Sequence, residues 1–325
     1  MKIMVTGANG FVGMEAVRQL WRDHEVLAVD SLRYGPWRFS EEEMQGFDVD
    51  ASDLRDRAAV ERLMRTFEPD AIIHLAAIHF IPECERLPDE AVSINIQATN
   101  NLLNSAPRRS RFVFASTAAV YAPSDVAHRE SDILGPMDVY GHSKLAAENF
   151  AEYFMSTRDF EAVIVRLFNV VGRGETNPHV LPEIIAQLRR GERRLSLGNI
   201  HPKRDYIHVS DAARGFIAAA VQPYPAELGS VPVVNLGSGV SYSVREMIHL
   251  LEDVVGARIA VEIDPAKVRK VDRPQLLADN TRMRTLFDWA PAYDLRAALA
   301  ETWAEAPRKR PAGVAETIDA AHPQA

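Results

Sequence analysis

Short apolar runs alternate with longer amphipathic patterns along the first half of the chain. The amphipathic patterns repeat apolar residues at the spacing of a helix, at 12–22, 57–67, 89–103 and 139–154. The apolar runs are nearly continuous, as in strands that are covered on both faces of a parallel sheet; they lie at 3–5, 26–29, 71–75, 112–115 and 162–167. The strand–helix alternation predicts an α/β fold with a doubly wound parallel sheet.

The pattern is less regular after Asn169. Glycine and proline recur, a helical pattern covers 183–191, and a further buried strand and helix are predicted at 231–236 and 243–255. We therefore predict a first domain at 1–168, a smaller mixed α/β lobe at 169–306, a segment near 205–236 that returns to the first domain, and a flexible tail at 307–325.

Composition narrows the class of protein. The 325 residues include 47% apolar residues, enough for a sizeable core, and the formal net charge of −8 argues against a nucleic-acid or membrane-surface partner. Cys84 is the only cysteine, which excludes an internal disulfide framework and a cysteine-rich zinc site. We expect no metal, no membrane span, no secretory leader, and a reducing, cytoplasmic location.

Three glycines follow the first predicted strand and open the first predicted helix. Gly7, Gly10 and Gly13 have the spacing that permits a tight turn, a close approach of backbone to a pyrophosphate, and close packing of helix on strand. A glycine-rich turn without a ligand is the alternative. The position between strand and helix favours a Rossmann-type dinucleotide-binding domain.

Acidic residues follow the next two strands. Asp30 ends the second strand, where a carboxylate can accept both ribose hydroxyls of NAD and repel the 2′-phosphate of NADP. Arg33, three residues later, means that NADP is not excluded as the cofactor. Asp53, before the helix at 57, is a candidate acceptor for the adenine amino group or a helix cap. These residues favour NAD as the cofactor.

A tyrosine and a lysine lie one helical turn apart at the start of the helix at 139–154. Tyr140 and Lys144 share one helix face, and a nearby ammonium favours the phenolate, so the pair can act as a base. Ser116 and Thr117 end the preceding strand, where small hydroxyl residues point into the ligand crevice of a parallel sheet. The structural alternative for Tyr140 and Lys144 is a solvated helix surface, and for Ser116 and Thr117 it is the capping of a helix or turn.

The combined motifs resemble the extended short-chain dehydrogenases/reductases of the nucleotide-sugar epimerase/dehydratase family. In order along the chain they are TGANGFVG (6–13), Asp30, DLRD (53–56), HLAA (74–77), NIQATNNLL (95–103), FASTAAVY (114–121), YGHSK (140–144), RLFNVVG (166–172) and RDYIHVSD (204–211). The resemblance implies a nucleotide-diphosphate sugar as substrate and a homodimer joined through the helices near 95–105 and 139–155.

The resemblance also implies roles for individual residues. Tyr140 would be the acid/base, Lys144 its partner, and Thr117 the hydroxyl that holds the sugar, with Ser116 matching an adjacent family serine. The cofactor residues would be Gly7, Gly10, Phe11, Val12, Gly13, Asp30, Arg33, Asp53, Leu54, Leu75, Ala76, Ala77, His79, Asn95, Tyr140 and Lys144. The substrate residues would be Thr117, Asn169, His179, Arg204, Arg269 and Asp272, with Arg273 a competitor for the place of Arg269.

Two alanines discriminate among the family's reactions. The family's dehydratases carry Asp-Glu, and its decarboxylases a Glu, where this chain has Ala118 and Ala119. Alanine cannot transfer a proton, so the resemblance favours a 4-epimerase that works through a 4-keto sugar. A reductase of nucleotide 4-keto sugars and a non-catalytic NAD-binding regulator are the alternatives. At Leu277 the family can place a large aromatic, so leucine there implies room for a bulkier hexose.

Overall fold

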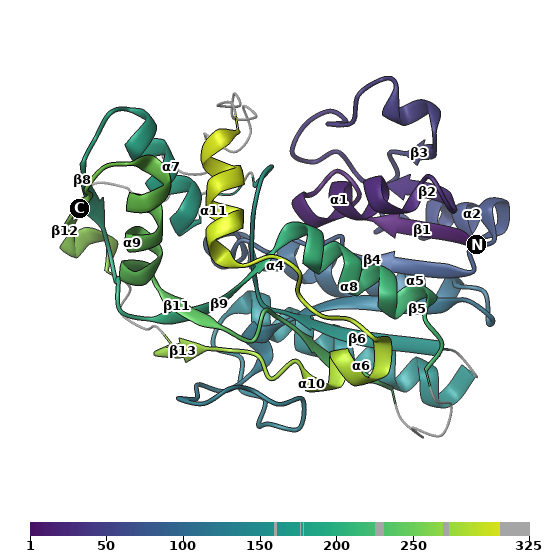
Figure 1. The fold of residues 1–325 in the computed structure, drawn as a ribbon. Coiled ribbons are helices and arrows are strands. Elements are labelled where there is room, and N and C mark those ends of the chain that lie inside the picture. Colours follow the sequence, from purple (N-terminus) through teal and green to yellow (C-terminus); the bar gives the residue numbers. More distant parts are fainter. Residues whose placement is uncertain (159–160, 176, 178, 225–230, 269–272, 306–325) are drawn as a thin grey trace.

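The computed structural model describes residues 1–158, 161–175, 177, 179–224, 231–268 and 273–305. Its main feature is a seven-stranded parallel sheet in the order β10-β6-β5-β4-β1-β2-β3 (Figure 1). The strands are β1 (Lys2–Thr6), β2 (Glu25–Val29), β3 (Asp48–Asp50), β4 (Ala71–His74), β5 (Arg111–Thr117), β6 (Glu161–Leu167) and β10 (Val233–Leu236). This is the predicted doubly wound α/β sheet.

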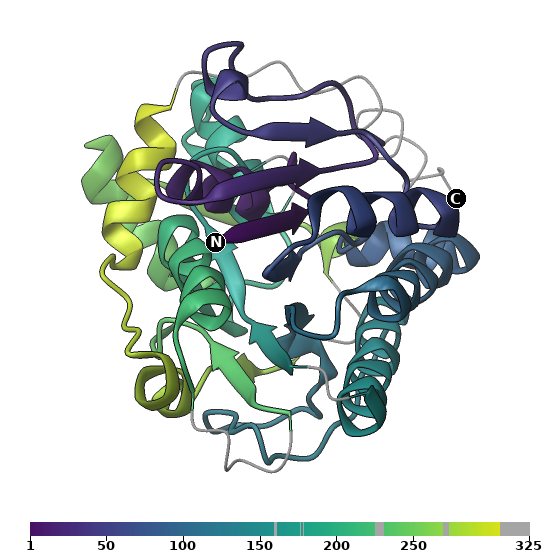
Figure 2. The same cartoon turned by 90° about the vertical axis from the view of Figure 1, so that its right-hand side faces the viewer.

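Helices cover both faces of the sheet, which is why its central strands are nearly continuous apolar runs (Figure 2). One face packs against α1 (Phe11–Leu20), α8 (Val209–Val221) and α10 (Thr281–Phe287). The other face packs against α2 (Arg57–Phe67), α5 (Ala98–Ser105) and α6 (Val139–Arg158). The strands end on one edge of the sheet, where ligands bind in folds of this kind.

The helix predicted at 89–103 consists of three parts. A short helix α4 (Pro88–Val92) runs into a π-helical turn, η2 (Ser93–Gln97), and then into α5. A second short helix, α3 (Ile81–Arg86), precedes them. The π turn contains Asn95, and such turns often occur at functional sites.

The second lobe has a core of its own, at the left of Figure 1. It contains the sheet β11 (Ser241–Ser243)-β9 (Lys203–His208)-β13 (Gln275–Leu276), with β7 (Asn169–Val171) beside β9. A two-stranded sheet pairs β12 (Ala260–Ile263) with β8 (Arg194–Leu197), and the lobe's helices are α7 (Val180–Arg189), α9 (Val244–Val255) and α11 (Leu295–Ala304).

The chain crosses between the two lobes more than once. The segment predicted to return near 205–236 divides: β9 belongs to the smaller sheet, whereas α8 and β10 complete the large one. Among the described helices, none has the length and apolarity that a membrane crossing needs. All of the predicted tail at 307–325 lies outside the described residues.

Candidate active site

A cavity of about 1190 Å³ lies at the carboxyl edge of the large sheet and extends into the second lobe. Its walls come from the loop after β1, from the ends of β2, β4 and β5, and from the start of α6. Of the residues predicted for the site, those that line the cavity are Gly7, Gly10, Phe11, Val12, Gly13, Asp30, Arg33, Asp53, Leu54, Leu75, Ala76, Ala77, His79, Ser116, Thr117, Tyr140, Lys144, Asn169, His179 and Arg204.

The glycine loop leaves no room for side chains. Gly7 has a φ of 69°, and a Cβ there would lie 2.6 Å from the backbone nitrogen of Ala76. A Cβ on Gly13 would overlap the carbonyl of Gly7, so α1 packs directly on the loop. Gly10 is the N-cap of α1 and provides no side-chain cap, so the first-turn amides remain available to an anion. The loop therefore fits a dinucleotide pyrophosphate.

Asp30 is positioned by two backbone amides. Its Oδ2 accepts a hydrogen bond from Asn9 N at 3.0 Å, and its Oδ1 accepts one from Leu32 N at 2.8 Å. Burial raises the pKa of Asp30, and the two amide hydrogen bonds oppose that shift. Each carboxylate oxygen keeps a second lone pair, so Asp30 fits a ribose with two free hydroxyls.

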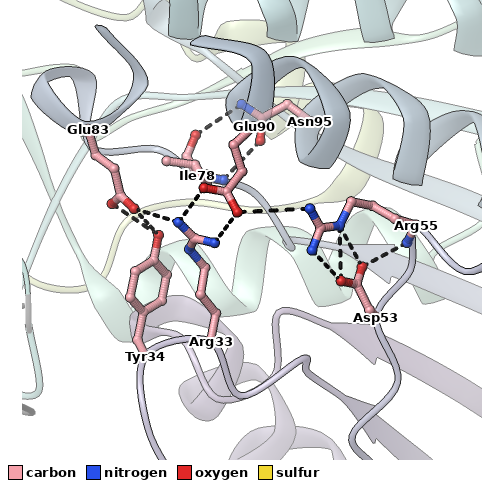
Figure 3. Close-up of polar contacts among 8 residues, drawn as sticks. All are labelled: Arg33, Tyr34, Asp53, Arg55, Ile78, Glu83, Glu90 and Asn95. Atoms are coloured by element: carbon pink, nitrogen blue, oxygen red, sulfur yellow. Dashed lines mark hydrogen bonds and ion pairs between the residues drawn. The ribbon is translucent and has the colours of Figure 1, made fainter. Parts of the chain in front are cut away.

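Asp53 and Arg33 are both engaged with neighbours of opposite charge (Figure 3). Asp53 accepts hydrogen bonds from Arg55, including one from Nε to Oδ2 at 2.9 Å, and these lower its pKa. Arg33 is bound by Glu83 and Glu90. The Asp53 carboxylate, expected to accept a hydrogen bond from the adenine amino group, therefore already accepts hydrogen bonds from Arg55.

Tyr140 and Thr117 meet at the centre of the cavity wall. Tyr140 is the second residue of α6, and Thr117 ends β5, where its Oγ1 accepts a hydrogen bond from Ala119 N at 3.1 Å. Burial beside an apolar cluster that includes Ile78 and Cys84 raises the pKa of Tyr140, and a side-chain hydrogen bond with Thr117 lowers it. The sequence-based expectation that the Tyr140 pKa is depressed is thus reversed here, because burial outweighs the other effects.

Lys144, one helical turn after Tyr140 on α6, is almost completely buried. Its Nζ lies 4.3 Å from the centroid of the Phe114 ring. Burial lowers the pKa of Lys144 to about 7, and the negative charge of Glu148 opposes this. Burial therefore opposes the positive charge that the sequence-based prediction assigns to this lysine.

Ser116 lines the cavity beside Thr117, but its hydroxyl is engaged by the scaffold. Adjacent residues of a strand point to opposite faces, so the two hydroxyls have different partners. The Ser116 hydroxyl is buried and donates a hydrogen bond to Oε1 of Glu148. Arg166 holds the same carboxylate, from Nη2 to Oε2 at 2.8 Å, and donates from Nη1 to the Tyr121 hydroxyl at 3.1 Å. Ser116 therefore anchors the strand end.

Asn95 also stabilises the wall instead of facing the cavity. Its Oδ1 accepts a hydrogen bond from Ile78 N at 2.9 Å, and its Nδ2 donates to Ile78 O at 3.0 Å and to Ser143 Oγ at 2.9 Å. The π turn brings Asn95 against both the segment after β4 and α6. His74 is buried between Thr6 and Thr99, and each ring nitrogen lies within hydrogen-bond distance of one threonine hydroxyl.

The second lobe places three of the predicted substrate residues on the cavity: Asn169, His179 and Arg204. The Arg204 guanidinium donates from Nη1 to Arg273 O at 2.9 Å. His79 reaches across from the first lobe, with its Nε2 2.8 Å from Nδ2 of Asn177. Arg269 and Asp272, the remaining pair, lie outside the described residues.

Arg273, the sequence-based alternative to Arg269, lines the cavity, and so does Leu276, which was not predicted. Arg273 donates from Nη2 to Ala119 O at 2.9 Å and from Nη1 to Tyr121 O, so it holds the loop that follows Thr117. Leu276 lines the cavity, whereas Leu277 does not. Neighbouring residues of an extended segment face opposite ways, which is why Leu276 and not Leu277 faces the cavity.

Several further residues of the site were missed. Glu148, Arg55, Glu83, Glu90 and Asn177 contact predicted site residues, and Arg166 contacts Glu148. Two of them had a local signal: Glu148 follows Lys144 by one helical turn, and Arg55 lies two residues after Asp53 in the DLRD motif. Among the described residues, no group of three or more His, Cys, Asp or Glu side chains is arranged to hold a metal.

Comparison with known proteins identifies the family. The model of the NAD dependent epimerase/dehydratase family matches residues 3–237. This chain belongs to that family. It is 30% identical to the UDP-glucose 4-epimerase of Rhizobium meliloti, an alignment that covers 93% of this chain and 95% of the relative. It is 28% identical to the GDP-6-deoxy-D-mannose reductase of Pseudomonas aeruginosa, over 92% and 94% of the two chains.

Solved structures extend the likeness to the whole fold. The UDP-glucose 4-epimerase of Bifidobacterium longum, crystallised with NAD⁺ and UDP, matches with a TM-score of 0.82 and 26% identity, over 93% of this chain and 97% of that one. The UDP-glucose 4-epimerase of Thermotoga maritima matches with the same TM-score and identity over the same shares. NAD is the cofactor of this family member, and the glycine loop and Asp30 fit it.

Proposed function

We propose that this protein is an NAD-dependent nucleotide-sugar 4-epimerase that acts on a UDP-hexose through a transient 4-keto intermediate. The observation that carries the proposal is the hydrogen-bonded pair of Tyr140 and Thr117 on the cavity wall. The two residues that follow Thr117 in the chain, Ala118 and Ala119, also line the cavity. A base and a hydroxyl are present, whereas the acids that an elimination needs at those positions are absent. Relatives named as UDP-glucose 4-epimerases support the choice of UDP.

The residues divide the chemistry among themselves. Thr117 holds the sugar O4, and Tyr140 takes its proton through the phenol oxygen. A protonated Lys144 favours the phenolate that this step requires. NAD, when bound, supplies a reversible hydride acceptor for sugar C4. Tyr140 returns the proton to O4 after the keto sugar has turned its other face, so one base serves both directions.

The cofactor and the substrate occupy the two halves of the cavity. The glycine loop and the first turn of α1 hold the dinucleotide phosphates, Asp30 the ribose, and Leu75, Ala76 and Ala77 the wall beside it. On the substrate side, Arg204 and Asn169 provide a cation and an amide for the sugar nucleotide's diphosphate, with His179 beside them. By family resemblance, Arg269 and Asp272 complete the substrate site.

A 4-keto-sugar reductase is the second candidate. The likeness to the GDP-6-deoxy-D-mannose reductase supports it, because such an enzyme uses the same Tyr–Lys pair. A reductase consumes its reduced cofactor and exchanges it, whereas an epimerase regenerates NAD in each turnover. The two functions are therefore separated by whether turnover continues without added reduced cofactor.

A cytoplasmic homodimer completes the proposal. Phe150 and Tyr153 on α6 are 39% and 60% exposed, as a helix that pairs with a second copy requires. In the segment 93–105, every residue of which is described, no large apolar side chain is exposed. Of the two helices predicted to form the dimer interface, α6 therefore provides the exposed apolar side chains. The single buried Cys84 is compatible with a reducing compartment.

The direct test is incubation of the purified protein with a panel of UDP- and GDP-hexoses, followed by NMR. We expect inversion at C4 without added NADH and without a change of mass. Turnover only with a 4-keto sugar and a reduced cofactor would instead support the reductase. A product lighter by one water would identify a dehydratase.

A further inference from the structure

Both arginines near the adenosine end of the cavity are bound by carboxylates (Figure 3). Arg33 donates from Nη2 to Oε2 of Glu90 at 2.8 Å and to Oε1 of Glu83 at 3.2 Å. Arg55 binds Asp53, and its Nη1 lies 3.9 Å from Oε1 of Glu90. Neither guanidinium is therefore left with an uncompensated charge.

The position of the partners shows where Arg33 is directed. Glu83 lies on α3 at the cavity wall, whereas Glu90 lies on α4 and does not line the cavity. The Tyr34 hydroxyl adds a hydrogen bond to Oε2 of Glu83 at 3.0 Å, which fixes that carboxylate. Figure 3 shows Arg33 and Tyr34 extending together from the loop after β2 toward α3 and α4.

The charge balance around this end of the cavity is negative. Asp30 and the three carboxylates that bind Arg33 and Arg55 give four negative charges, against three positive charges from Arg33, Arg55 and Arg38. Arg38 donates to the backbone oxygens of Asn9 and Gly174. NADP differs from NAD by a phosphate at the 2′ position of the adenosine ribose, which needs a cation with free donors. Arg33 lines the cavity on the loop directly after Asp30 and is therefore a cation placed to supply them.

We propose that Glu83 and Glu90 are specificity-determining residues that hold Arg33 away from the 2′ position, so that the protein selects NAD over NADP. Asp30 repels the phosphate directly, and the two glutamates remove the cation that would compensate. This inference rests on the proposed dinucleotide site but not on the sugar chemistry, because the readout is cofactor binding.

The test measures the Kd of NAD and of NADP by calorimetry on the full-length protein. In an Asp30→Asn background, adding Glu83→Gln and Glu90→Gln should release Arg33 and tighten NADP binding roughly tenfold, while NAD binding changes by less than about threefold. Adding Arg33→Ala should abolish the gain. Glu61→Gln, which breaks an exposed ion pair with Arg57, is the matched charge control and should leave the ratio of the two Kd values unchanged.

Two results would overturn the proposal. One is an unchanged NADP-to-NAD ratio after the glutamate substitutions in a protein that still binds NAD. The other is a gain that persists with Arg33→Ala, which would mark a general charge effect. Glu90→Gln alone, at a partly exposed side chain, keeps the test valid if the multiple variant does not fold; it should improve NADP binding about threefold. A parent protein that binds neither dinucleotide would contradict the proposed function instead.

Discussion

Arg166 binds Glu148 through two hydrogen bonds in the buried layer behind the site, Nη2 to Oε2 at 2.8 Å and Nε to Oε1 at 3.1 Å. The same carboxylate accepts the Ser116 hydroxyl, next to Thr117, and lies one helical turn beyond Lys144. This pair therefore joins β5, β6 and α6 at the point where the candidate catalytic residues leave the scaffold.

We predict that Glu148→Ala destabilises the protein by about 3–5 kcal/mol, because it leaves the Arg166 charge buried without its partner. Urea unfolding monitored by circular dichroism measures the change. Glu61→Ala, in the exposed pair with Arg57, is the control and should cost less than about 0.5 kcal/mol. A Glu148→Ala variant as stable as the control would show that the buried pair does not support this junction.

The glycine loop allows a comparison at matched backbone conformation. Gly7 and Gly256 both have a φ of 69°, but a Cβ on Gly256 meets nothing within 4 Å, whereas one on Gly7 meets the backbone of Ala76. Gly256→Ala should therefore cost only the conformational strain, about 1–2 kcal/mol, and keep NAD binding. Gly7→Ala should cost more and abolish NAD binding in calorimetry. Equal effects of the two substitutions would contradict the role of the loop.

Burial of Lys144 predicts a trade-off between stability and function. The folded-state pKa of about 7 lies below the ordinary value of 10.5, so between these pH values the unfolded chain binds one more proton than the folded one. The resulting destabilisation is absent above about pH 10.5, grows as the pH falls, and is complete below about pH 7.

Lys144→Met removes this penalty. In the cofactor-free protein it should raise the free energy of unfolding by an amount on the order of 4 kcal/mol at pH 7, and by much less at pH 10. Denaturant titrations at both pH values measure the difference between variant and parent. The variant should lose epimerase activity. A stability gain that does not change with pH would show that Lys144 is not the titrating group.

The pattern of apolar residues predicted the central layer of the fold well. The helix expected at 57–67 has those bounds in the structure, because Asp56 caps it by accepting hydrogen bonds from Ala58 N and Ala59 N. The edge strand β3 was not assigned a range, since it carries two aspartates in three residues. The π turn inside the helix expected at 89–103 could not be predicted, because Asn95 is held there by Ile78 and Ser143.

In the site, too, features that depend on nearby residues were predicted from the sequence, and features that depend on distant contacts were not. Glycine spacing and the Tyr140–Lys144 interval are local, and both ends of each motif line one cavity. The contact of Arg273 with Ala119 joins residues 154 positions apart, and no local pattern predicts it. The tertiary fold also determines protonation. It buries Lys144 and Tyr140, which lowers the pKa of the lysine and raises the pKa of the tyrosine, so both neutral forms are favoured.

The most direct test of the account is the turnover of Tyr140→Phe with a UDP-hexose that the parent converts. The substitution keeps the ring that packs beside Ile78 and Cys84 but removes the oxygen that moves the O4 proton. We predict that turnover falls about 10²–10⁴-fold while the Kd of NAD hardly changes. Near-normal turnover of Tyr140→Phe would contradict the proposed mechanism at its central step.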